Sequence, residues 1–393
     1  MHVVLFGCAF PERPEAGVDR VHVRRACALA ERAAVTAVVP TPWAPPGIGG
    51  PGDRWARHRT TPHHAEIDGI RLLFPRYLQV PGMGAWAGVT MALGAARTVR
   101  RLQREGCCDV LFAQTLLPEG LAAVLLGRRL GLPVACLGRG TDVHGLATRS
   151  ATTRRLARWT VRRATAIGVV ANALAEALGA VASAAPCTVL ANGVDLERFT
   201  PGSAVDARRA LGLNLQAPLA LYVGRLAEGK GLDTLLDAFA ALRALVPAAR
   251  LVLVGTGRLR AHLERRVLAA GLALAVRFAG EVPHHAVARW MRAADVLVLP
   301  SEAEGFPNVV REALACGRPV VATTVGDLPR VVTPAAGRLV APADPAALAW
   351  AIAHVLSERW DPAAIRAQAI DMTWERNAEA TVRFLATTIR GTA

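Results

Sequence analysis

Residues 296–317 read VLVLPSEAEGFPNVVREALACG, and this stretch decides the fold class. A continuous apolar run ends at Pro300, a polar turn with two glutamates follows, and a helical pattern begins at Asn308. Such a run is typical of a strand buried on both faces, and Pro307 is suited to start a helix. The stretch therefore predicts a strand, a turn rich in carboxylates and a helix.

The same alternation of strand and helix patterns runs along the whole chain. In the first half, apolar runs predict strands at Val3–Phe6, Val35–Val39, Ile70–Phe74, Val110–Ala113, Val134–Leu137, Ile167–Val170 and Thr188–Leu190. In the second half, they predict strands at Leu219–Val223, Leu251–Val254, Val276–Ala279, Val296–Leu299, Val320–Ala322 and Arg338–Val340. Helical patterns occupy Val18–Arg32, Ala87–Arg104, Gly120–Leu130, Thr152–Arg163, Leu232–Leu245, Arg258–Ala270, His285–Ala293, Asn308–Ala315, Pro345–Leu356 and Trp374–Ile389.

Apolar strands that alternate with helices favour parallel sheets covered on both faces. These strands are too many for one sheet, so we expect an α/β protein with two doubly wound, Rossmann-like domains facing across a cleft. The length of 393 residues suits two domains, and 52% hydrophobic residues exclude a disordered, collagen-like or small disulfide-rich protein. We place the domains at 1–200 and 201–372, because Pro and Gly interrupt the pattern at 199–203. We expect residues 373–393 to form a C-terminal helix that can return to the first domain.

The formal net charge is +15, and Lys230 is the only lysine. The preference for Arg and Ala is typical of a GC-rich genome, so part of this charge is compositional. A basic surface favours phosphates, anionic lipid or nucleic acid. The sequence has no helix-turn-helix, zinc or base-stacking motif, so we do not expect nucleic acid as a partner.

The seven cysteines include no Cys-x-x-Cys pair, and most lie in apolar runs. We interpret them as buried free thiols in a reducing compartment. The first ten residues, MHVVLFGCAF, lack a basic region and indicate a strand rather than a signal peptide. Residues Tyr77–Ala96 are uncharged apart from their flanks, but their glycines and proline make a poor transmembrane helix. We expect a cytoplasmic protein, with peripheral contact with the inner face of the cell membrane as a further option.

A candidate phosphate site follows the strand at Leu219–Val223. Gly224 and Gly231 allow a tight turn into the next helix, and Arg225 and Lys230 project from that turn. Backbone N–H groups at a helix N-terminus add positive potential, so the turn is suited to a diphosphate. The alternative is an ordinary exposed turn. The Gly-x-Gly at 255–257 lacks the rest of a dinucleotide fingerprint, and we interpret it as a plain strand-to-helix turn.

A second candidate site is the turn that follows Val296–Leu299. Glu304 lies before the helix, and Asn308 and Glu312 share one helical face at i and i+4. Two carboxylates in this arrangement suit two hydroxyl-bearing groups of one ligand, such as a sugar and a ribose. The alternative is a capped helix with a solvated glutamate.

These motifs resemble the family-4 retaining glycosyltransferases of the GT-B fold. The segments that carry the resemblance are Asn192-Gly-Val-Asp195 with Phe199 and Pro201, Val223-Gly-Arg225 with Lys230-Gly231, Glu304-Gly-Phe-Pro-Asn-Val-Val-Arg-Glu312-Ala-Leu-Ala-Cys-Gly, and Arg318-Pro-Val-Val321. The first half is also similar to members that build bacterial cell-surface polysaccharides such as teichuronic acid. That likeness rests on Phe10-Pro11, Glu66-Ile-Asp-Gly69 with Pro75-Arg-Tyr77, and Arg139-Gly-Thr-Asp142.

The resemblance implies that the second domain binds a nucleotide-diphosphate sugar and that the first binds a glycan or lipid-linked acceptor. Arg225 and Lys230 would neutralise the diphosphate, and Glu304 would contact the sugar. The remaining donor-side residues would be Gly224, Gly305, Phe306, Pro307, Asn308 and Glu312, with Glu312 at the ribose. The acceptor-side residues would be Gly17, Arg139, Thr141 and Asp142. The family implies no metal, no cofactor and no protein nucleophile, and the sequence has no Asp-x-Asp motif.

Two alternatives to a glycosyltransferase stay open. The GT-B fold also hosts nucleotide-sugar epimerases, against which the Glu-x7-Glu pattern at 304–312 argues. A catalytically silent scaffold of a polysaccharide assembly complex is the other, because Arg139 lies where many relatives have His and Arg330 where Glu is common.

Two basic segments lie outside these motifs. No acid separates the six arginines between residues 149 and 163, and Arg154, Arg158 and Arg162 share a helical face. They favour an anionic membrane or a phosphate-bearing lipid, and the alternative is a solvated helix. The segment with Met83, Trp86 and Met91, followed by arginines at 97–104, could likewise contact lipid or form a core helix.

Overall fold

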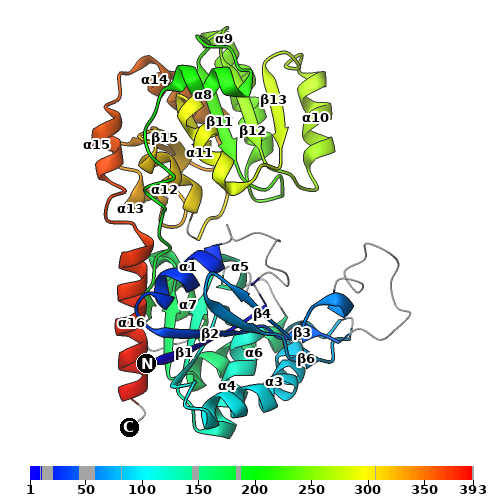
Figure 1. Ribbon diagram of the computed structural model, residues 1–393. Coiled ribbons are helices and arrows are strands. Elements are labelled where there is room, and N and C mark those ends of the chain that lie inside the picture. The colour runs from blue at the N-terminus through cyan, green and yellow to red at the C-terminus, as the bar shows by residue number, and fades with distance from the viewer. Residues whose placement is uncertain are drawn as a thin grey trace. The chain divides into compact units, whose positions relative to one another are not determined.

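The computed structural model describes residues 1–8, 10, 21–43, 58–80, 82–143, 150–182, 187–305 and 307–391, without the side chains of Thr141, Val181 and Ala182. Internal contacts divide the chain into two compact units. The first unit contains Met1–Asn192 together with Trp374–Ala393, and the second contains Gly193–Thr373. Figure 1 shows the elements of both units.

The first unit is built around a parallel sheet. The strands of this unit are β1 (His2–Phe6), β2 (Ala34–Val38), β3 (Thr41–Pro42), β4 (His64–Ile67), β5 (Ile70–Leu73), β6 (Arg76–Tyr77), β7 (Val110–Ala113), β8 (Val134–Gly138), β9 (Ala166–Val169) and β10 (Thr188–Val189). Strands β3 and β6 pair with each other in a separate two-stranded sheet. Its helices are α1 (Val21–Ala30), η2 (Gly84–Trp86), α3 (Ala87–Arg104), α4 (Glu119–Leu130), α5 (Gly140–Val143), α6 (Ala151–Arg163), α7 (Asn172–Ala182) and α16 (Trp374–Arg390).

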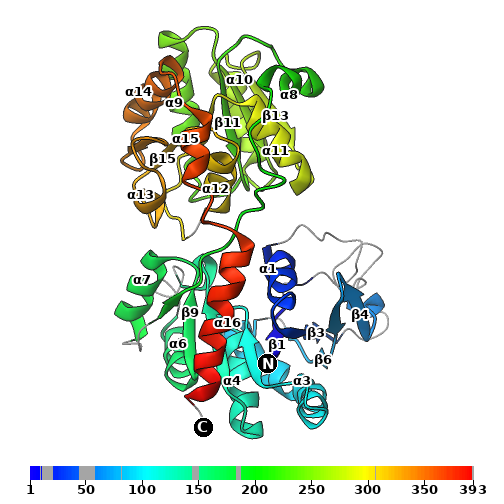
Figure 2. The ribbon, with the colours of Figure 1, turned by 60° about the vertical axis from the view of Figure 1, so that its left-hand side comes forward.

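The sheet order of the first unit is β10-β9-β8-β7-β1-β2-β5-β4, and all neighbours are parallel except β4 and β5. Helix α16 returns from the end of the chain and packs against α1, β7 and β8 (Figure 2). The Phe112 and Phe384 rings meet edge to face at 6.3 Å, and the Asn377 amide donates to the Ala191 carbonyl at 2.6 Å. The chain's last helix is therefore part of the first unit's core.

The second unit has a parallel sheet of six strands. They are β11 (Leu219–Val223), β12 (Arg250–Val254), β13 (Val276–Gly280), β14 (Val296–Leu299), β15 (Val320–Thr323) and β16 (Gly337–Val340), and their order is β13-β12-β11-β14-β15-β16. The helices are α8 (Ala204–Leu211), α9 (Leu232–Leu245), α10 (Arg260–Ala269), α11 (His284–Ala293), α12 (Asn308–Ala315), α13 (Leu328–Val331), α14 (Pro345–Ser357) and α15 (Pro362–Ala367).

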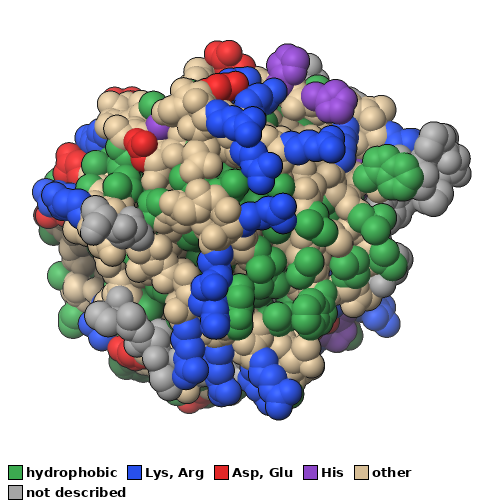
Figure 3. Space-filling view, turned by 90° about the horizontal axis from the view of Figure 1, so that it is seen from below, with side chains coloured by type: hydrophobic (Ala, Val, Ile, Leu, Met, Phe, Trp, Pro, Cys, Tyr) green, Lys and Arg blue, Asp and Glu red, His purple; other side chains and the backbone are tan. Residues whose placement is uncertain are grey.

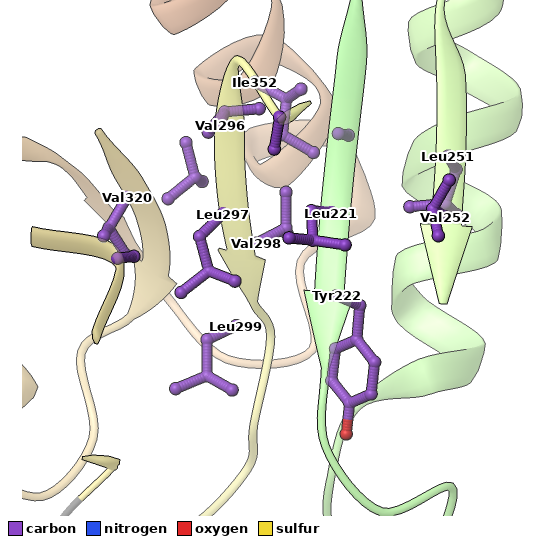
Figure 4. Close-up of a cluster of buried hydrophobic side chains, with 14 of the residues drawn as sticks. Leu221, Tyr222, Leu251, Val252, Val296, Leu297, Val298, Leu299, Val320 and Ile352 are labelled. Carbon is purple, nitrogen blue, oxygen red and sulfur yellow. The ribbon is translucent and has the colours of Figure 1, made fainter. Parts of the chain in front are cut away.

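The central strands of this sheet are apolar on both faces, as the continuous runs in the sequence predict. Leu221, Leu297 and Val320 lie on three neighbouring strands and are at most 1% exposed (Figure 4). Ile352 of α14 is fully buried against this layer. Burial of each such side chain contributes about 2 kcal/mol, so the centre of the sheet is the rigid part of the unit.

Most predicted strands and helices end within two residues of the observed bounds. The sequence pattern missed β4, because His64–Ile67 is a partly exposed antiparallel edge strand with no apolar run. It also missed α7 and α8, which are rich in alanine or short.

The contact-based division lies at Asn192 and Gly193, eight residues before the expected boundary at 200. Val194 and Phe199 are buried in the core of the second unit. The Val194 N–H also donates to the Met372 carbonyl at 2.7 Å, which holds the two connecting segments together. The Pro and Gly residues at 201–202 follow this anchored segment rather than separate the units.

Candidate donor and acceptor sites

The two turns expected to bind a donor lie side by side in the second unit. Strands β11 and β14 are neighbours in the sheet, so the segments after Val223 and Leu299 emerge at the same edge. The strand order reverses between them, and ligands of open α/β sheets bind at such a switch point. Gly224, Arg225 and Lys230 follow β11, and Gly305, Pro307, Asn308 and Glu312 follow β14. Phe306 lies outside the described residues.

Lys230 and Glu304 form the central contact of this edge. Lys230 Nζ lies 2.5 Å from Glu304 Oε1, and Ser301 Oγ donates to the same oxygen at 2.7 Å. The Glu304 side chain is 10% exposed and that of Lys230 is 23% exposed, so the pair is largely shielded from water. Lysine carries three N–H donors, so Lys230 can bind a further anion while it remains bonded to Glu304.

Glycines permit the two turns to approach this closely. Gly231 has φ +61°, and a Cβ there would lie 1.9 Å from the Pro300 carbonyl oxygen. Gly326 has φ +56°, and its Cβ would lie 2.0 Å from the Glu304 carbonyl oxygen. A side chain at either position would push the turns apart, because backbone oxygen cannot move aside as a flexible side chain can.

The Gly-x-Gly turn at 255–257 also has a packing role. A Cβ on Gly255 would lie 1.9 Å from the Gly224 carbonyl oxygen, and a Cβ on Gly257 2.2 Å from that of Leu226. The Leu226 N–H donates to Thr256 at 2.9 Å. This turn therefore supports the segment that presents Arg225. Arg225 itself is exposed and forms no ion pair within the described part of the chain.

Glu312 does not point freely into solvent. It is 8% exposed, and its Oε1 lies 2.8 Å from His284 Nε2. His284 is the first residue of α11, one residue before the start at His285 that the sequence pattern predicts. No pattern in the sequence predicts this contact, because 28 residues separate the two side chains and His284 belongs to no recognised histidine motif. The imidazole fixes the direction of the Glu312 carboxylate.

The segment Asn192–Phe199 has a structural role. Asp195 Oδ1 accepts the Arg198 N–H at 3.0 Å, and Arg366 donates to the carbonyls of Leu196 and Phe199 at 2.9 and 2.7 Å. The Phe199 ring lies 5.3 Å from the His284 ring. The motif thus supports the residue that holds Glu312.

In the first unit, Arg139 and Asp142 lie at the carboxyl end of β8. Both Asp142 oxygens accept backbone N–H groups at 2.6 Å, one from Arg139 and one from Leu116. Arg139 Nε donates to the Gln114 carbonyl at 2.8 Å, and Arg139 Nη1 lies 3.3 Å from His22 Nε2. Gly17 lies outside the described residues, as does the side chain of Thr141.

Sequence reasoning missed two neighbours of Arg139, His22 and Arg25, which are i and i+3 on α1. Arg25 is 1% exposed and donates to the Leu190 carbonyl and the Asn192 side chain. Its Nε and Nη1 have no hydrogen-bond partner in the part of the chain that the structure describes. Burial, together with the charge of Arg139, holds the pKa of Arg25 well below its usual range. Burial lowers the pKa of Arg139 to about 10.

All seven cysteines are free, as expected, but only Cys108, Cys136 and Cys316 are buried. Cys8 is exposed, and Cys27, Cys107 and Cys187 are partly exposed. Burial raises the pKa of Cys136 and Cys316 to about 12, which makes both thiols unreactive at neutral pH.

Two family models match the chain, and together they span both units. The model described as "Glycosyl transferases group 1" matches residues 205–372, and that described as "Glycosyltransferase Family 4" matches residues 16–198. The first match contains the Lys230–Glu304 edge and the second contains the Arg139–Asp142 turn.

The chain is 29% identical over 331 residues to TuaC of Bacillus subtilis (strain 168), which is named for a glycosyltransferase role in teichuronic acid biosynthesis. The alignment covers 84% of this chain and 82% of that protein. The chain is 36% identical over 297 residues to D-inositol 3-phosphate glycosyltransferase 1 of Catenulispora acidiphila, which covers 70% of each chain.

Among solved structures, sucrose-phosphate synthase from Thermosynechococcus elongatus aligns with a TM-score of 0.74 at 23% identity over 98% of this chain and 99% of that one. Alr3699/HepE from Anabaena, in complex with UDP, aligns with a TM-score of 0.73 at 18% identity over 98% of this chain and 100% of that one. At these identities the structures show the fold, which is GT-B with two Rossmann-like domains.

Asp142 should make the stability of the first unit depend on pH. Burial raises its pKa to about 6, above the 3.8 of an exposed aspartate, so the folded state favours the protonated form. The stabilisation is complete below the unfolded pKa and is lost as the pH rises through 6. We expect the free energy of unfolding of the wild type, relative to that of Asp142→Asn, to fall by about 2 kcal/mol between pH 4 and 7. Urea unfolding of both proteins across this range measures the difference, and a pH-independent difference would contradict the assignment.

Proposed function

Because the chain belongs to the group 1 and family 4 glycosyltransferases of the GT-B fold, we propose that it is a retaining hexosyltransferase that uses a nucleotide-diphosphate sugar. The acceptor is a hydroxyl of a cell-surface glycan or of a lipid-linked acceptor, in keeping with the name of the B. subtilis relative. The observation that carries this proposal is the shielded Lys230–Glu304 pair, with Arg225 on the same turn as Lys230.

In the proposed reaction, the second unit binds the donor. Arg225 and Lys230 offset the charge of the diphosphate, with the first N–H groups of α9 and α12 as further donors. The UDP in the Anabaena structure belongs to that protein and supports a nucleotide donor for this one. Glu304 contacts the sugar hydroxyls, and Glu312, held by His284, binds the ribose.

The bond between the sugar C1 and the diphosphate oxygen breaks as the acceptor oxygen attacks from the same face. The acceptor proton passes to the leaving phosphate oxygen, so no protein nucleophile is needed. Arg225 and Lys230 stabilise the negative charge that develops on the leaving diphosphate. In metal-dependent enzymes a divalent ion stabilises this charge. We therefore propose transfer without a metal or cofactor.

The first unit binds the acceptor in this proposal. Arg139, Arg25 and His22 gather positive charge and hydrogen-bond donors at one end of its sheet, and Arg25 retains unbonded N–H groups within the described chain. A buried guanidinium without an anion is costly, because its desolvation is not offset. The cluster therefore supports an acceptor that carries a phosphate or a carboxylate.

A thermal-shift panel with UDP, GDP, ADP and CMP tests the donor site. A ligand at 100 times its Kd stabilises the fold by ~2.7 kcal/mol. We expect a shift with one nucleotide, its loss in Lys230→Ala, and its retention in Arg265→Ala, a control on the exposed face of α10. The absence of a shift with every nucleotide would favour the silent scaffold.

Turnover should depend on both members of the central pair. Lys230→Ala and Glu304→Ala should each cost at least ~2 kcal/mol of transition-state stabilisation, or ~30-fold in kcat/KM, because each loses a charged contact with the reacting donor. Steady-state kinetics with the nucleotide sugar found in the panel measure the loss. Wild-type turnover in both variants is incompatible with the site assignment.

The cluster of Arg25, Arg139 and His22 predicts that inorganic phosphate binds in the first unit, independently of the nucleotide site. Phosphate should raise the unfolding temperature of the wild type more than chloride at equal ionic strength, because it pairs with Arg25 and Arg139. Arg25→Met should lose this increment and keep the nucleotide shift, whereas Lys230→Ala should do the reverse. A phosphate increment that is lost only in Lys230→Ala would place the anion in the donor site instead.

A further inference from the structure

An apolar groove lies on the outer face of three adjacent helices of the first unit. It has a volume of about 440 Å³ and is lined by Trp86, Val89, Leu121, Leu125, Leu156 and Trp159, with Thr152 and Arg155 at its side. These residues come from η2 and the first turns of α3, from α4 and from α6. Trp86 is 51% exposed, which is unusual for the largest apolar side chain of a surface helix.

The surface formed by these helices is strongly basic, although Glu105, which directly follows α3, lies 3.8 Å from Arg101. The exposed charged residues of α3, α4 and α6 are Arg97, Arg100, Arg101, Arg104, Arg128, Arg129, Arg155, Arg158, Arg162 and Arg163. The only acid on the three helices is Glu119, and it is 7% exposed. Figure 3 views this end of the first unit and shows a row of Lys and Arg side chains beside a broad group of hydrophobic ones.

One contact positions a groove residue, and a second links α4 to the sheet. The Arg163 guanidinium lies 4.8 Å from the centre of the Trp159 ring, which holds that ring at the groove wall. Leu121 lies on the first turns of α4, two residues after Glu119, whose Oε1 accepts the Cys8 N–H at the carboxyl end of β1. The groove is thus one helix away from the edge of the sheet that carries the acceptor-side residues.

The positive charge around the groove indicates which partner binds there. A second copy of this chain would place the same ten arginines against each other, because a two-fold interface uses the same patch on both partners. An anionic bilayer instead presents phosphates to the arginines and an apolar interior to the groove. Tryptophan is favoured at the boundary between headgroups and acyl chains, which matches the half-exposed Trp86.

We propose that the face formed by α3, α4 and α6 docks on an anionic phospholipid bilayer, with Trp86 and the groove in the acyl boundary and the arginines on the headgroups. The proposed function explains why such docking would be useful, because a lipid-linked acceptor lies in a membrane. In this respect alone the proposal rests on the proposed function. Bilayer docking itself requires no donor, no acceptor and no turnover.

Co-sedimentation of the full chain with vesicles tests the docking. We expect binding to phosphatidylcholine vesicles that contain 30% phosphatidylglycerol, ~10-fold weaker binding to phosphatidylcholine alone, and weaker binding in 0.5 M than in 0.1 M NaCl. Arg155→Glu with Arg162→Glu should weaken binding to the anionic vesicles at least ~30-fold. The matched control is Arg265→Glu with Arg289→Glu, two exposed arginines of the second unit, and it should change binding by less than ~3-fold.

The apolar part of the surface has its own variant. Trp86→Ala should weaken binding ~10-fold and should do so equally at both salt concentrations, because insertion of an indole is not screened by ions. The control is Trp350→Ala, which removes another exposed tryptophan from α14 of the second unit. Circular dichroism of each variant confirms that it is folded.

Three results would overturn the proposal. They are equal binding to neutral and anionic vesicles, equal binding by the two arginine variants, and a stable dimer in sedimentation velocity that Trp86→Ala dissociates. A failure of docking beside a normal nucleotide shift would leave the donor site intact. Docking without any nucleotide shift would instead retain the membrane surface and reject the proposed transfer.

Discussion

The close approach of the two turns after β11 and β14 is the constraint on which the Lys230–Glu304 contact depends. Two parallel strands emerge in the same direction, so the segments that follow them must share the space above one edge of the sheet. Gly231 and Gly326 allow backbone to approach backbone there. The side chains of Lys230 and Glu304 then join the two turns, and Ser301 Oγ donates to the same Glu304 oxygen.

The same geometry recurs in the first unit, where the strand order reverses between β1 and β7. The segment after β7 carries Gln114 and Glu119, and both contact residues of neighbouring segments, Arg139 and Cys8. Each unit thus gathers its polar side chains at its own switch point. The chemistry differs because the second unit pairs its lysine directly with a carboxylate, whereas the first places the buried Arg25 near the partly buried Arg139, which contacts the His22 imidazole.

Much of this architecture could be predicted from the sequence, because buried parallel strands leave continuous apolar runs. The bounds of β7, β11 and β14 and of α3, α9 and α12 agree with the predicted ranges. Strand order could not be predicted, because neighbours such as β11 and β14 are about 70 residues apart in the sequence. Neither apolar run contains a pattern that identifies the strand it pairs with. The roles of single residues were harder still. The i, i+4 spacing predicts that Asn308 and Glu312 share a helical face, but the bond from Glu312 to His284 depends on how α11 packs against α12.

The role of Arg25 could not be predicted from the sequence either. In a chain with 45 arginines, composition gives no signal that distinguishes one buried guanidinium from the exposed ones. The arginines differ in burial. Ten of them on α3, α4 and α6 are exposed, and solvent screens their mutual repulsion, whereas Arg25 is buried and Arg139 is partly buried, so both have lost part of that screening. The exposed set acts collectively and is suited to a surface of many charges, whereas the buried set is suited to one anion. We therefore propose that the excess positive charge of this chain serves two kinds of recognition in the first unit, and that the depth of each guanidinium decides which.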